Sequence, residues 1–413
     1  MAVAGRRGPL RRRRRLRVGL VQLLFTLAGL GLGLLVPRIS GGLDIPARPV
    51  VDMLLALGVG VLGTVAVIFS LLLLVVQWAH TSFTPRLTLF REAPIVWRTF
   101  AFAIGLTVYC VTAALAIGSR SRVSVALPIL TAVLLLSMLA LLRVLQLRAL
   151  VSIELAPVLR VITERGGAAL DALYPPDGAA AGPAPAAGPV NAPVVHTVTW
   201  PNAPAVLQQI DVERLVKAAH AADAVVVLSS PPGSVLRHGA ALAELHGAVL
   251  PDAVVLGALV TGVAPTFDQD AALAIRLLAD IALRALSPAV NDPATAVQAL
   301  GCLEDLLGGP AAQRAHRAGP LRVADPDGQV RVVVRRPAWE DLVRTGLDDV
   351  IAAGVNSPMV LARIRVLLQR LASAVPPAGQ ALLERRLVWV EAEFSGRFPA
   401  LWQEAVADPG SGV

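Results

Sequence analysis

Residues 267–308 read FDQDAALAIRLLADIALRALSPAVNDPATAVQALGCLEDLLG, and they predict two helices that meet at a polar corner. Apolar residues recur at helical spacing from Ala271 to Leu286, Asp268 or Asp270 can cap this first helix, and Ser287-Pro288 ends it. Asp292-Pro293 starts the second helix, because the aspartate accepts an amide hydrogen and proline at the first helical position donates none. The second helix stops at Gly308-Gly309-Pro310. We expect the soluble half of the chain to be organised around this pair.

Polar residues gather at this corner and along the first helix. Arg276, Asp280 and Arg284 are spaced by four and share a helix face. This face is either solvated or internally paired, or it forms a subunit interface or a gate. Asn291-Asp292 is either a helix start or a phosphate or metal site, and a metal would need more converging oxygen ligands than the sequence offers. The candidate gate or interaction residues are Arg276, Asp280, Arg284, Ser287, Asn291, Asp292 and Thr295.

Outward from this pair, charge divides the chain in two. The 413 residues have a mean hydropathy of +0.66, which is too apolar for an ordinary soluble enzyme. Residues 1–150 hold 17 Arg and three acidic residues, a net +14, whereas residues 151–413 carry a net −6. The basic excess therefore belongs to the apolar part of the chain, and we expect no nucleic-acid partner.

Several kinds of chemistry are excluded or unsupported. Lys217 is the only lysine, so no Walker A loop exists, and Cys110 and Cys302 are too few for a disulfide framework or a cysteine zinc site. The sequence has no Ser-His-Asp pattern, HExxH motif or glycine-rich nucleotide fingerprint. Five histidines lie in the second part of the chain, and their spacing does not match that of metal ligands: His196, His220, His238, His246 and His316. We expect no enzyme activity, no cofactor and no metal site.

Four apolar runs lie in the first part of the chain: Val18–Val36, Val50–Trp78, Phe100–Ile117 and Val123–Leu142. A spanning helix needs about 20 apolar residues, so all four are predicted membrane helices. The first run is longer than the apolar part of a typical signal peptide and no clear small-residue cleavage site follows it. We therefore interpret it as a spanning helix.

Arginines near the ends of these runs predict the orientation. With a cytoplasmic N-terminus, that side carries thirteen of them and the opposite side four. Cytoplasmic loops are enriched in Lys and Arg, so we expect both termini to lie in the cytoplasm. The cluster Arg11–Arg15 is interpreted as a topology signal that contacts anionic headgroups, with a nucleic-acid arm as the alternative.

The spans contain no Asp, Glu, Lys, Arg or His apart from boundary residues such as Asp52 and His80. Proton-coupled transporters usually keep an ionisable group inside the membrane, so that class is disfavoured. Glycines such as Gly29 and Gly33 permit close helix contact, or reflect overall composition. The segment 77–86 is predicted to cross the cytoplasmic interface, with candidate interface residues Trp78, His80, Phe83, Pro85 and Arg86.

The soluble half is predicted to be α+β. Asp211 caps a helix that runs to Ala222, and 224–245 has the pattern of a hairpin, like half of a barrel-sandwich, while Asp325-Pro-Asp-Gly328 turns a second hairpin. Helical stretches follow at 339–353, 357–374 and 379–394. The predicted organisation is a basic segment at 1–17, a four-helix transmembrane domain at 18–148, a helical extension and Pro/Ala/Gly-rich connector at 149–194, a β-hairpin subdomain at 195–260, a helical subdomain with an inserted hairpin at 261–407 and a disordered tail at 408–413.

Five stretches together resemble a known family: SLLLLVVQWAHTSFTPRL (70–87), VYC (108–110), QQIDVERLVKAA (208–219), PPGSVLRHGAAL (231–242) and DIALRALSPAVNDPATAVQAL (280–300). The chain is similar to the bacterial predicted membrane proteins grouped as domain of unknown function 2254. The resemblance covers nearly the whole chain and implies four helices, a soluble domain and no established activity. This chain departs from the family at 261–267, TGVAPTF, where a more charged run is expected.

Two functional hypotheses remain. The preferred one is an oligomeric passive channel of the bacterial inner membrane with a cytoplasmic vestibule or gate, because the spans are uncharged and an acidic soluble domain favours cations. The alternative is a membrane-anchored sensor or scaffold whose cytoplasmic domain binds a ligand or protein at the Arg284–Thr295 corner. An enzyme acting on lipid is disfavoured. The expected partners are the lipid bilayer, further copies of the chain and an unidentified protein or small ligand.

Overall fold

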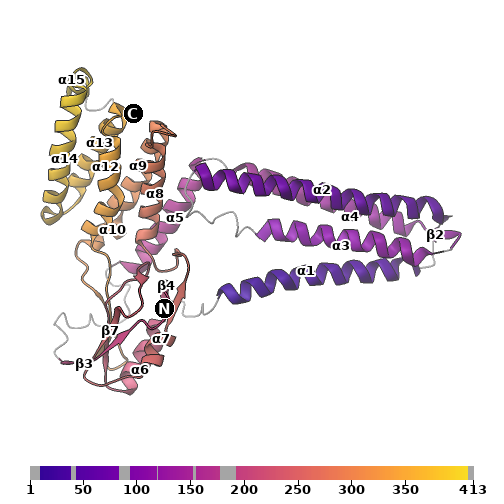
Figure 1. Cartoon of the computed structure of the whole chain (residues 1–413), viewed down its shortest axis with the longest axis horizontal. Coiled ribbons are helices and arrows are strands. Elements are labelled where there is room, and N and C mark those ends of the chain that lie inside the picture. The colour runs from indigo at the N-terminus through magenta and orange to yellow at the C-terminus, as the bar shows by residue number, and fades with distance from the viewer. Residues whose placement is uncertain are drawn as a thin grey trace. The chain divides into compact units, whose positions relative to one another are not determined.

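The computed structural model describes residues 10–38, 43–82, 94–118, 120–151, 155–176 and 192–407. The chain divides into two compact units, one covering Arg6–Glu154 and the other containing Leu155–Val413 (Figure 1). The first unit is almost entirely helical, and the second combines β-sheets with helices. The predicted fold class, a four-helix membrane domain followed by an α+β soluble domain, is confirmed.

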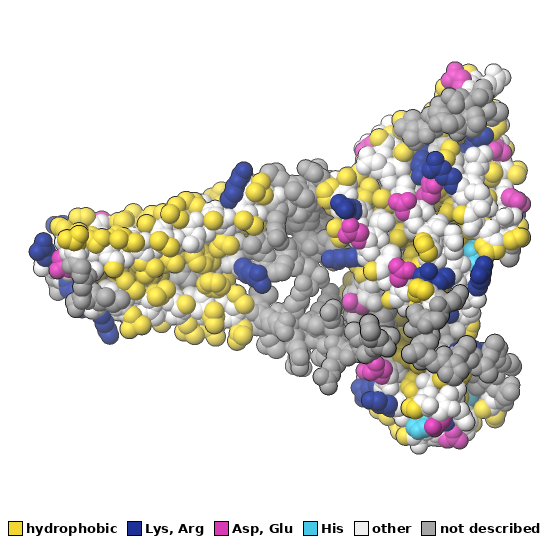
Figure 2. Space-filling view, turned by 180° about the vertical axis from the view of Figure 1, so that it is seen from behind, with side chains coloured by type: hydrophobic (Ala, Val, Ile, Leu, Met, Phe, Trp, Pro, Cys, Tyr) yellow, Lys and Arg dark blue, Asp and Glu magenta, His cyan; other side chains and the backbone are white. Residues whose placement is uncertain are grey.

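The four predicted membrane helices are confirmed as long apolar helices. Within the described residues, the segments apolar enough to span a bilayer are Gly19–Arg38, Ala47–Leu71, Trp97–Ile117 and Ala126–Leu147. Hydrophobic side chains cover the face of this unit seen in Figure 2. The helices, with the short 3-10 segment η1, are α1 (Leu10–Leu35), η1 (Val36–Arg38), α2 (Ala47–Ser82), α3 (Pro94–Ile117) and α4 (Ala126–Val151).

The fourth helix begins later than its apolar run predicts. Val123 belongs to strand β2 (Arg122–Ser124), which pairs antiparallel with β1 (Asp44–Pro46), and the Ser124 hydroxyl accepts from the Ala126 amide where α4 begins. The expectation that Val123 is helical is therefore wrong. The physical reason is that β-branched Val123 packs in this short ribbon, where it is buried.

Helix α3 packs closely against α1. A Cβ placed on Gly29 would overlap the Gly105 backbone, and one on Gly33 would overlap the Thr112 side chain. Without a hydrophobic driving force between helices in lipid, such small residues let backbones approach and gain packing contacts. Of the two interpretations that the sequence left open for Gly29 and Gly33, close helix contact is the one that the structure supports.

Two sheets form the β-rich part of the soluble unit. One has the order β3-β7-β5-β10-β9 and the other β6-β4-β8. Among the described strands, only β5 and β10 run parallel, with Val226 opposite Val332, and the other neighbours are antiparallel. The strands are β3 (Val194–Thr199), β4 (Ala205–Ile210), β5 (Val225–Leu228), β6 (Val235–Leu236), β7 (Ala241–His246), β8 (Leu259–Gly262), β9 (Leu321–Ala324) and β10 (Val330–Val334).

The hairpin expected at 224–245 is divided between these sheets. Strands β5 and β7 pair as predicted, but β6 leaves them and pairs with β4. The β9–β10 hairpin is confirmed, and it joins the sheet built from strands before residue 247. Local patterning identifies strands but not their distant partners, because register and pairing depend on which faces the whole domain buries. Strands from the predicted 195–260 and 261–407 subdomains therefore share one sheet.

Helix α8 lies at the centre of the helical part. Ten of its residues are buried, and the backbones around it pack tightly: a Cβ at Gly166 would overlap Ala274, and one at Gly346 would press on Ile275. The predicted corner is confirmed, since α9 starts with Asp292 as its cap and Pro293 in its first turn. The helices and the π-helical segment η3 are α5 (Leu155–Leu173), α6 (Val212–Ala221), α7 (Asp252–Gly257), α8 (Ala272–Ala285), α9 (Pro293–Gly308), α10 (Pro310–Ala315), α11 (Trp339–Val343), η3 (Arg344–Asp348), α12 (Asp349–Gly354), α13 (Pro358–Ala374), α14 (Pro377–Arg397) and α15 (Pro399–Ala407).

Candidate functional site

A cavity of about 280 Å³ opens at the N-terminal end of α8, and we call it the α8 pocket. It collects residues from segments far apart in the chain: the end of α5, the loop before β6, the start of α8, the segment after β10, and α11 with η3. The lining residues are Leu173, Pro231, Pro232, Gly233, Ser234, Gln269, Asp270, Ala271, Ala272, Arg276, Arg335, Pro337, Asp341, Leu342 and Thr345.

A buried ion pair forms one wall of the α8 pocket. The Asp270 side chain is only 2% exposed and pairs with Arg276 one turn into α8, and its other oxygen accepts from the Ala272 amide at 3.1 Å. Burial raises the pKa of the Asp270 carboxyl above its usual range, although Arg276 and the helix amides oppose this shift. The Asp270 carboxylate thus accepts from the first amide of α8, but the N-cap position is Ala271, so neither aspartate that the sequence offered is the N-cap of this helix.

The loop 231–234 forms the facing wall. Gly233 has φ +92°, a conformation that favours glycine, and its amide donates to the Leu207 carbonyl of β4 at 2.7 Å. A Cβ at this position would overlap the Asp270 carboxylate. The two prolines before Gly233 stiffen the loop. Because Gly233 has no side chain, its backbone lies directly against the Asp270 carboxylate.

The outer rim of the α8 pocket carries the remaining polar groups. The Asp341 carboxylate pairs with Arg344 at 2.8 Å, and the Thr345 hydroxyl donates to the Asp341 carbonyl at 2.6 Å. Arg335 is exposed, and among the described residues its guanidinium has no hydrogen-bond or ion-pair partner. The Ser234 hydroxyl likewise has none within that part of the chain. These groups offer donors for a ligand.

The end of α5 is anchored at this pocket. Leu173 lines it, and the next residue, the fully buried Tyr174, donates its hydroxyl to the Pro337 carbonyl. Arg336 donates to the Leu173 carbonyl at 2.8 Å, and Arg314 donates to the Tyr174 carbonyl at 2.6 Å. Burial and the neighbouring Asp341 outweigh Arg336 and raise the pKa of Tyr174 to about 12, so this phenol stays a donor. The helix end is therefore held firmly against the pocket wall.

The predicted corner lies at the other end of α8. Both carboxylate oxygens of Asp292 accept from Thr295, at 3.1 Å from the amide and 2.6 Å from the hydroxyl, which lowers the pKa of Asp292. The Ser287 hydroxyl donates to the Arg284 carbonyl at 2.7 Å, and Asn291 has φ +46° in the turn. The structure thus brings these residues together as a helix start. Their role as a gate or interaction site stays a prediction.

The predicted helix face of Arg276, Asp280 and Arg284 extends along α8, and not all of it lies at that corner. Arg276 lies at the pocket end with Asp270, while Asp280 and Arg284 are half-buried further along the helix. The Nε of Arg284 is buried and has no hydrogen-bond partner among the described residues. Since α8 rises about 1.5 Å per residue over its length, Arg276 and Arg284 are about 12 Å apart along the axis and belong to separate environments.

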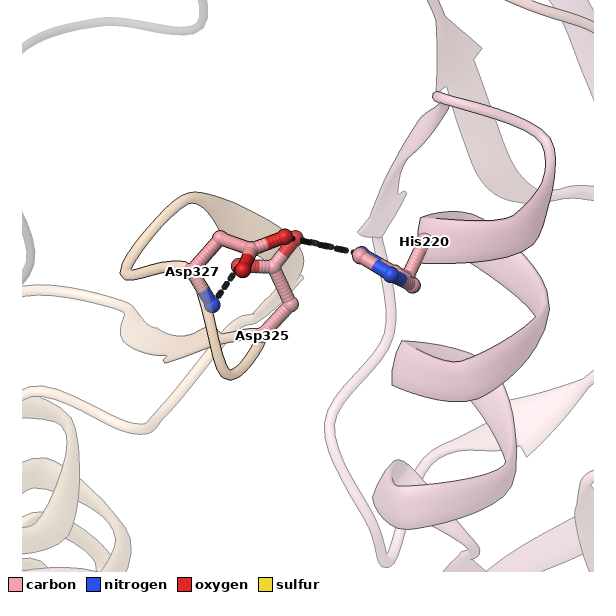
Figure 3. Close-up of side chains that lie close together, drawn as sticks. All are labelled: His220, Asp325 and Asp327. Carbon is pink, nitrogen blue, oxygen red and sulfur yellow. Dashed lines mark hydrogen bonds and ion pairs between the residues drawn. The ribbon is translucent and has the colours of Figure 1, made fainter.

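A second cluster joins His220 of α6 to Asp325 and Asp327 in the β9–β10 turn (Figure 3). The His220 ring lies 2.9 Å from Asp325 Oδ2 and 3.9 Å from Asp327 Oδ2. The same Asp325 oxygen accepts from buried Arg331 at 2.7 Å, and Arg331 also pairs with Asp223 at 2.7 Å. A guanidinium therefore already supplies the positive charge that a metal ion would bring. This donor set fits an ion-pair network better than a metal site.

A further hollow, of about 380 Å³, lies between α9 and α13. Of its two acidic residues, Glu304 and Asp305, the first already pairs with Arg363 and with Arg370, the latter at 3.3 Å. Its polar groups are thus largely used within the protein. The α8 pocket is the stronger candidate, because its rim keeps donors free.

The predicted interface residues fall at the edge of the described region. Trp78 and His80 belong to the helical backbone of α2, and Phe83, Pro85 and Arg86 lie outside the described residues. Residues 177–191 of the predicted extension and connector at 149–194, and the tail at 408–413, also lie outside the described residues. The interface role of these five residues stays a prediction.

Sequence reasoning missed the α8 pocket and the His220 cluster. Two signals were present: the rigid Pro231-Pro232-Gly233 turn and the strong turn at 325–328. Neither tells which distant helix it faces. The pairing of β10 with β5 places the second turn beside α6, and the packing of α8 places Asp270 under the first.

Comparison with known proteins agrees with this architecture. Uncharacterized proteins of Mycobacterium tuberculosis and Mycobacterium bovis are 32% identical to this chain over 130 residues, which make up 30% of this chain and 24% of each relative. The match thus spans about a quarter of those relatives. No solved structure matches the chain at a significant level. The profile of the family described as predicted membrane protein (DUF2254) matches residues 15–370, which confirms the resemblance, and the chain belongs to this family of membrane proteins.

Proposed function

We propose that this protein is a membrane-anchored sensor whose soluble unit binds a small ligand in the α8 pocket, without transforming it. One observation carries the proposal: Arg335, which has no partner among the described residues, lines the same cavity as the buried Asp270–Arg276 pair. Small-ligand sites are typically concave, with a few converging polar groups among apolar walls. The α8 pocket has this composition.

Helix α5 supports a link from the pocket to the membrane. Its last residue, Leu173, lines the pocket, and its first, Leu155, follows α4 in the chain after only residues 152–154. Along α5 the packing is tight, since Gly166 is pressed against Ala274 of α8. A ligand that shifts the pocket wall therefore acts directly on the helix that follows the last membrane span in the chain.

The proposed setting is the bacterial inner membrane, with both termini in the cytoplasm. Support comes from the arginine distribution near the helix ends, thirteen on one side against four on the other. With that orientation the α8 pocket samples cytoplasmic ligands. Reporter fusions at Gly41 and Val413 that respond to the periplasm and the cytoplasm respectively test this arrangement.

A passive channel is the second candidate, favoured by spans whose Asp, Glu, Lys, Arg and His residues lie only near their ends. Half of the residues in the apolar stretch of α3 are buried within one subunit, whereas 17–22% are buried in the apolar stretches of the other three spans. A single bundle is therefore well packed around α3, and a water path would need to lie between subunits of a homo-oligomer. The net charge of −6 after residue 150 would favour cations at its mouth.

The proposal is tested on the full-length protein in nanodiscs by following thermal unfolding through tryptophan fluorescence. The probes are phosphate, citrate, glucose and spermidine. A ligand that binds only the folded state raises the unfolding midpoint. The variant Thr345→Trp fills the pocket, and Ser373→Trp is its matched control, because Ser373 is also an exposed helical hydroxyl bonded to its own helix backbone.

We expect at least one probe to raise the midpoint in the wild type and in Ser373→Trp but not in Thr345→Trp. A response to none of the four, or an equal response in both variants, would overturn the sensor proposal. Potassium flux into liposomes decides the second candidate. Flux above that of empty liposomes, altered by Arg284→Ala combined with Asp292→Ala, would support a channel gated at the α8–α9 corner.

A further inference from the structure

We propose that the α8 pocket is selective for small anions and that Arg335 and Arg276 bind their carboxylate or phosphate oxygens. This inference rests on the proposed function, because it names the ligand class of the same pocket. It follows from the charge balance of the lining, from the donors left unused and from the size of the cavity.

The four charged lining residues, Asp270, Arg276, Arg335 and Asp341, sum to zero, and with Arg344 beside Asp341 the lining and its rim carry one net positive charge. Asp270 and Arg276 neutralise each other within the wall, and Asp341 is neutralised by Arg344 just outside it. Arg335 has no such partner among the described residues. A cationic ligand would meet this surplus charge unfavourably, whereas an anion would neutralise it and form charge-assisted hydrogen bonds.

Unused donors point to the same class of ligand. A guanidinium carries five N–H groups, and within the described residues the Arg276 side chain bonds only to Asp270 while remaining 30% exposed. Arg335 offers a second guanidinium group with several N–H donors, and the Ser234 hydroxyl adds a neutral donor. Two guanidinium groups on one cavity suit planar carboxylate or tetrahedral phosphate oxygens.

The start of α8 does not supply this site. The Ala272 amide already donates to Asp270 Oδ1, and the Leu273 amide to the Asp270 carbonyl at 3.3 Å. Asp270 thus acts as an internal anion at the helix end. The ligand must therefore bind on the outer side of the Arg276 guanidinium, toward Arg335.

The size of the pocket limits the ligand. A volume of about 280 Å³ is near the lower limit of the range of ligand pockets, roughly 300–1,000 Å³. The rigid loop with Gly233 cannot retreat without leaving the Leu207 carbonyl. The pocket therefore suits an anion the size of phosphate or of a di- or tricarboxylate, and not a nucleotide.

Isothermal titration calorimetry of the full-length protein in phosphatidylcholine nanodiscs tests the inference, with inorganic phosphate and citrate as probes at constant ionic strength. The variants are Arg335→Gln and Arg335→Lys. Arg317→Gln is the matched control, since Arg317 is an exposed arginine of the same unit outside the pocket, and its side chain has no partner among the described residues. Glucose and spermidine are titrated in parallel, and nanodiscs with phosphatidylglycerol show whether an anionic headgroup competes.

We expect at least one anion to bind the wild type and Arg317→Gln, and to bind Arg335→Gln about tenfold more weakly or worse, with Arg335→Lys between them. Weaker apparent binding with phosphatidylglycerol would assign the oxyanion to a headgroup rather than a soluble metabolite. Absence of anion binding, or equal affinity in Arg335→Gln, would overturn the inference. If only glucose or spermidine binds, and Thr345→Trp abolishes that binding, the sensor proposal still holds but the inference that the ligand is an anion is overturned.

Discussion

Gly233 and Asp270 lie in direct contact, so that any side chain at Gly233 would overlap the Asp270 carboxylate. The contact joins a loop of the β-rich part to the segment immediately before α8. One wall of the α8 pocket is therefore set by a backbone and the other by a buried ion pair. A side chain added at Gly233 would therefore displace the Asp270 carboxylate, because the two groups already touch.

Replacing Gly233 by alanine should destabilise the soluble unit by roughly 1–3 kcal/mol, from backbone strain and from overlap with Asp270. Gly239→Ala is the matched control, since Gly239 also has positive φ, +75°, but a Cβ there would meet no atom within 4 Å. Tryptophan fluorescence, with buried Trp339 as the reporter, measures the unfolding midpoint. Equal losses in both variants would contradict the contact with Asp270.

The Asp325 side chain should stabilise the β9–β10 turn more than its neighbour Asp327 does. The Asp325 carboxylate accepts from two backbone amides and also from the side chains of Arg331 and His220. The Asp327 side chain, in contrast, is 71% exposed. Its hydrogen bond from Arg331 holds the pKa of Asp325 well below its usual range, so its stabilising effect is present above about pH 4 and is lost as pH falls below that value. Asp325→Ala should lower the unfolding midpoint at neutral pH, and Asp327→Ala should lower it less.

Zinc and manganese should leave that midpoint unchanged in the wild type, because Arg331 already occupies the position of a cation beside Asp325. A rise in the midpoint with either metal that is absent in His220→Ala would contradict this and would assign the His220 cluster as a metal site.

His316 should make the soluble unit sensitive to mild acid. Its ring stacks on Trp339 at 4.1 Å, its side chain is 3% exposed, and burial lowers its pKa although Glu340 opposes this. The unfolded chain then binds a proton more readily, so stability falls as pH drops through about 6.5. His316→Phe keeps a stacked ring and removes the titration. Unfolding midpoints at neutral and mildly acidic pH should differ more in the wild type than in His316→Phe.

The α1–α3 contact should depend on Gly29 but not on Gly31. Gly29→Val would overlap the Gly105 backbone and cost about 1–3 kcal/mol, whereas a Cβ at Gly31 meets nothing within 4 Å. Thermal unfolding of the purified protein in detergent compares the two variants, which make the same substitution in one helix. Similar midpoints for Gly29→Val and Gly31→Val would show that α1 does not pack on α3 at this position.

Much of the fold was predictable because its signals are local. The four spans follow from apolar runs of 18–29 residues, and the α8–α9 corner follows from Ser287-Pro288 and the Asp292-Pro293 cap. The strand at Val123 was not predictable from hydropathy, because a short strand and the start of an apolar helix have the same composition. The departure of β6 from the β5–β7 pair was hidden for a related reason: pairing partners are not encoded within the strand.

The sequence by itself therefore determined the membrane spans, the central helix pair and the turn at Asp325, since hydropathy, caps and turn residues act over a few neighbouring positions. Only the tertiary structure decided the α8 pocket and the His220 cluster. Leu173, Gly233, Asp270 and Arg335 come from four separate segments, and burial of α8 beneath the 231–234 loop is what brings them together. Such a site depends on the packing of the whole unit, and so no short pattern in the chain could predict it.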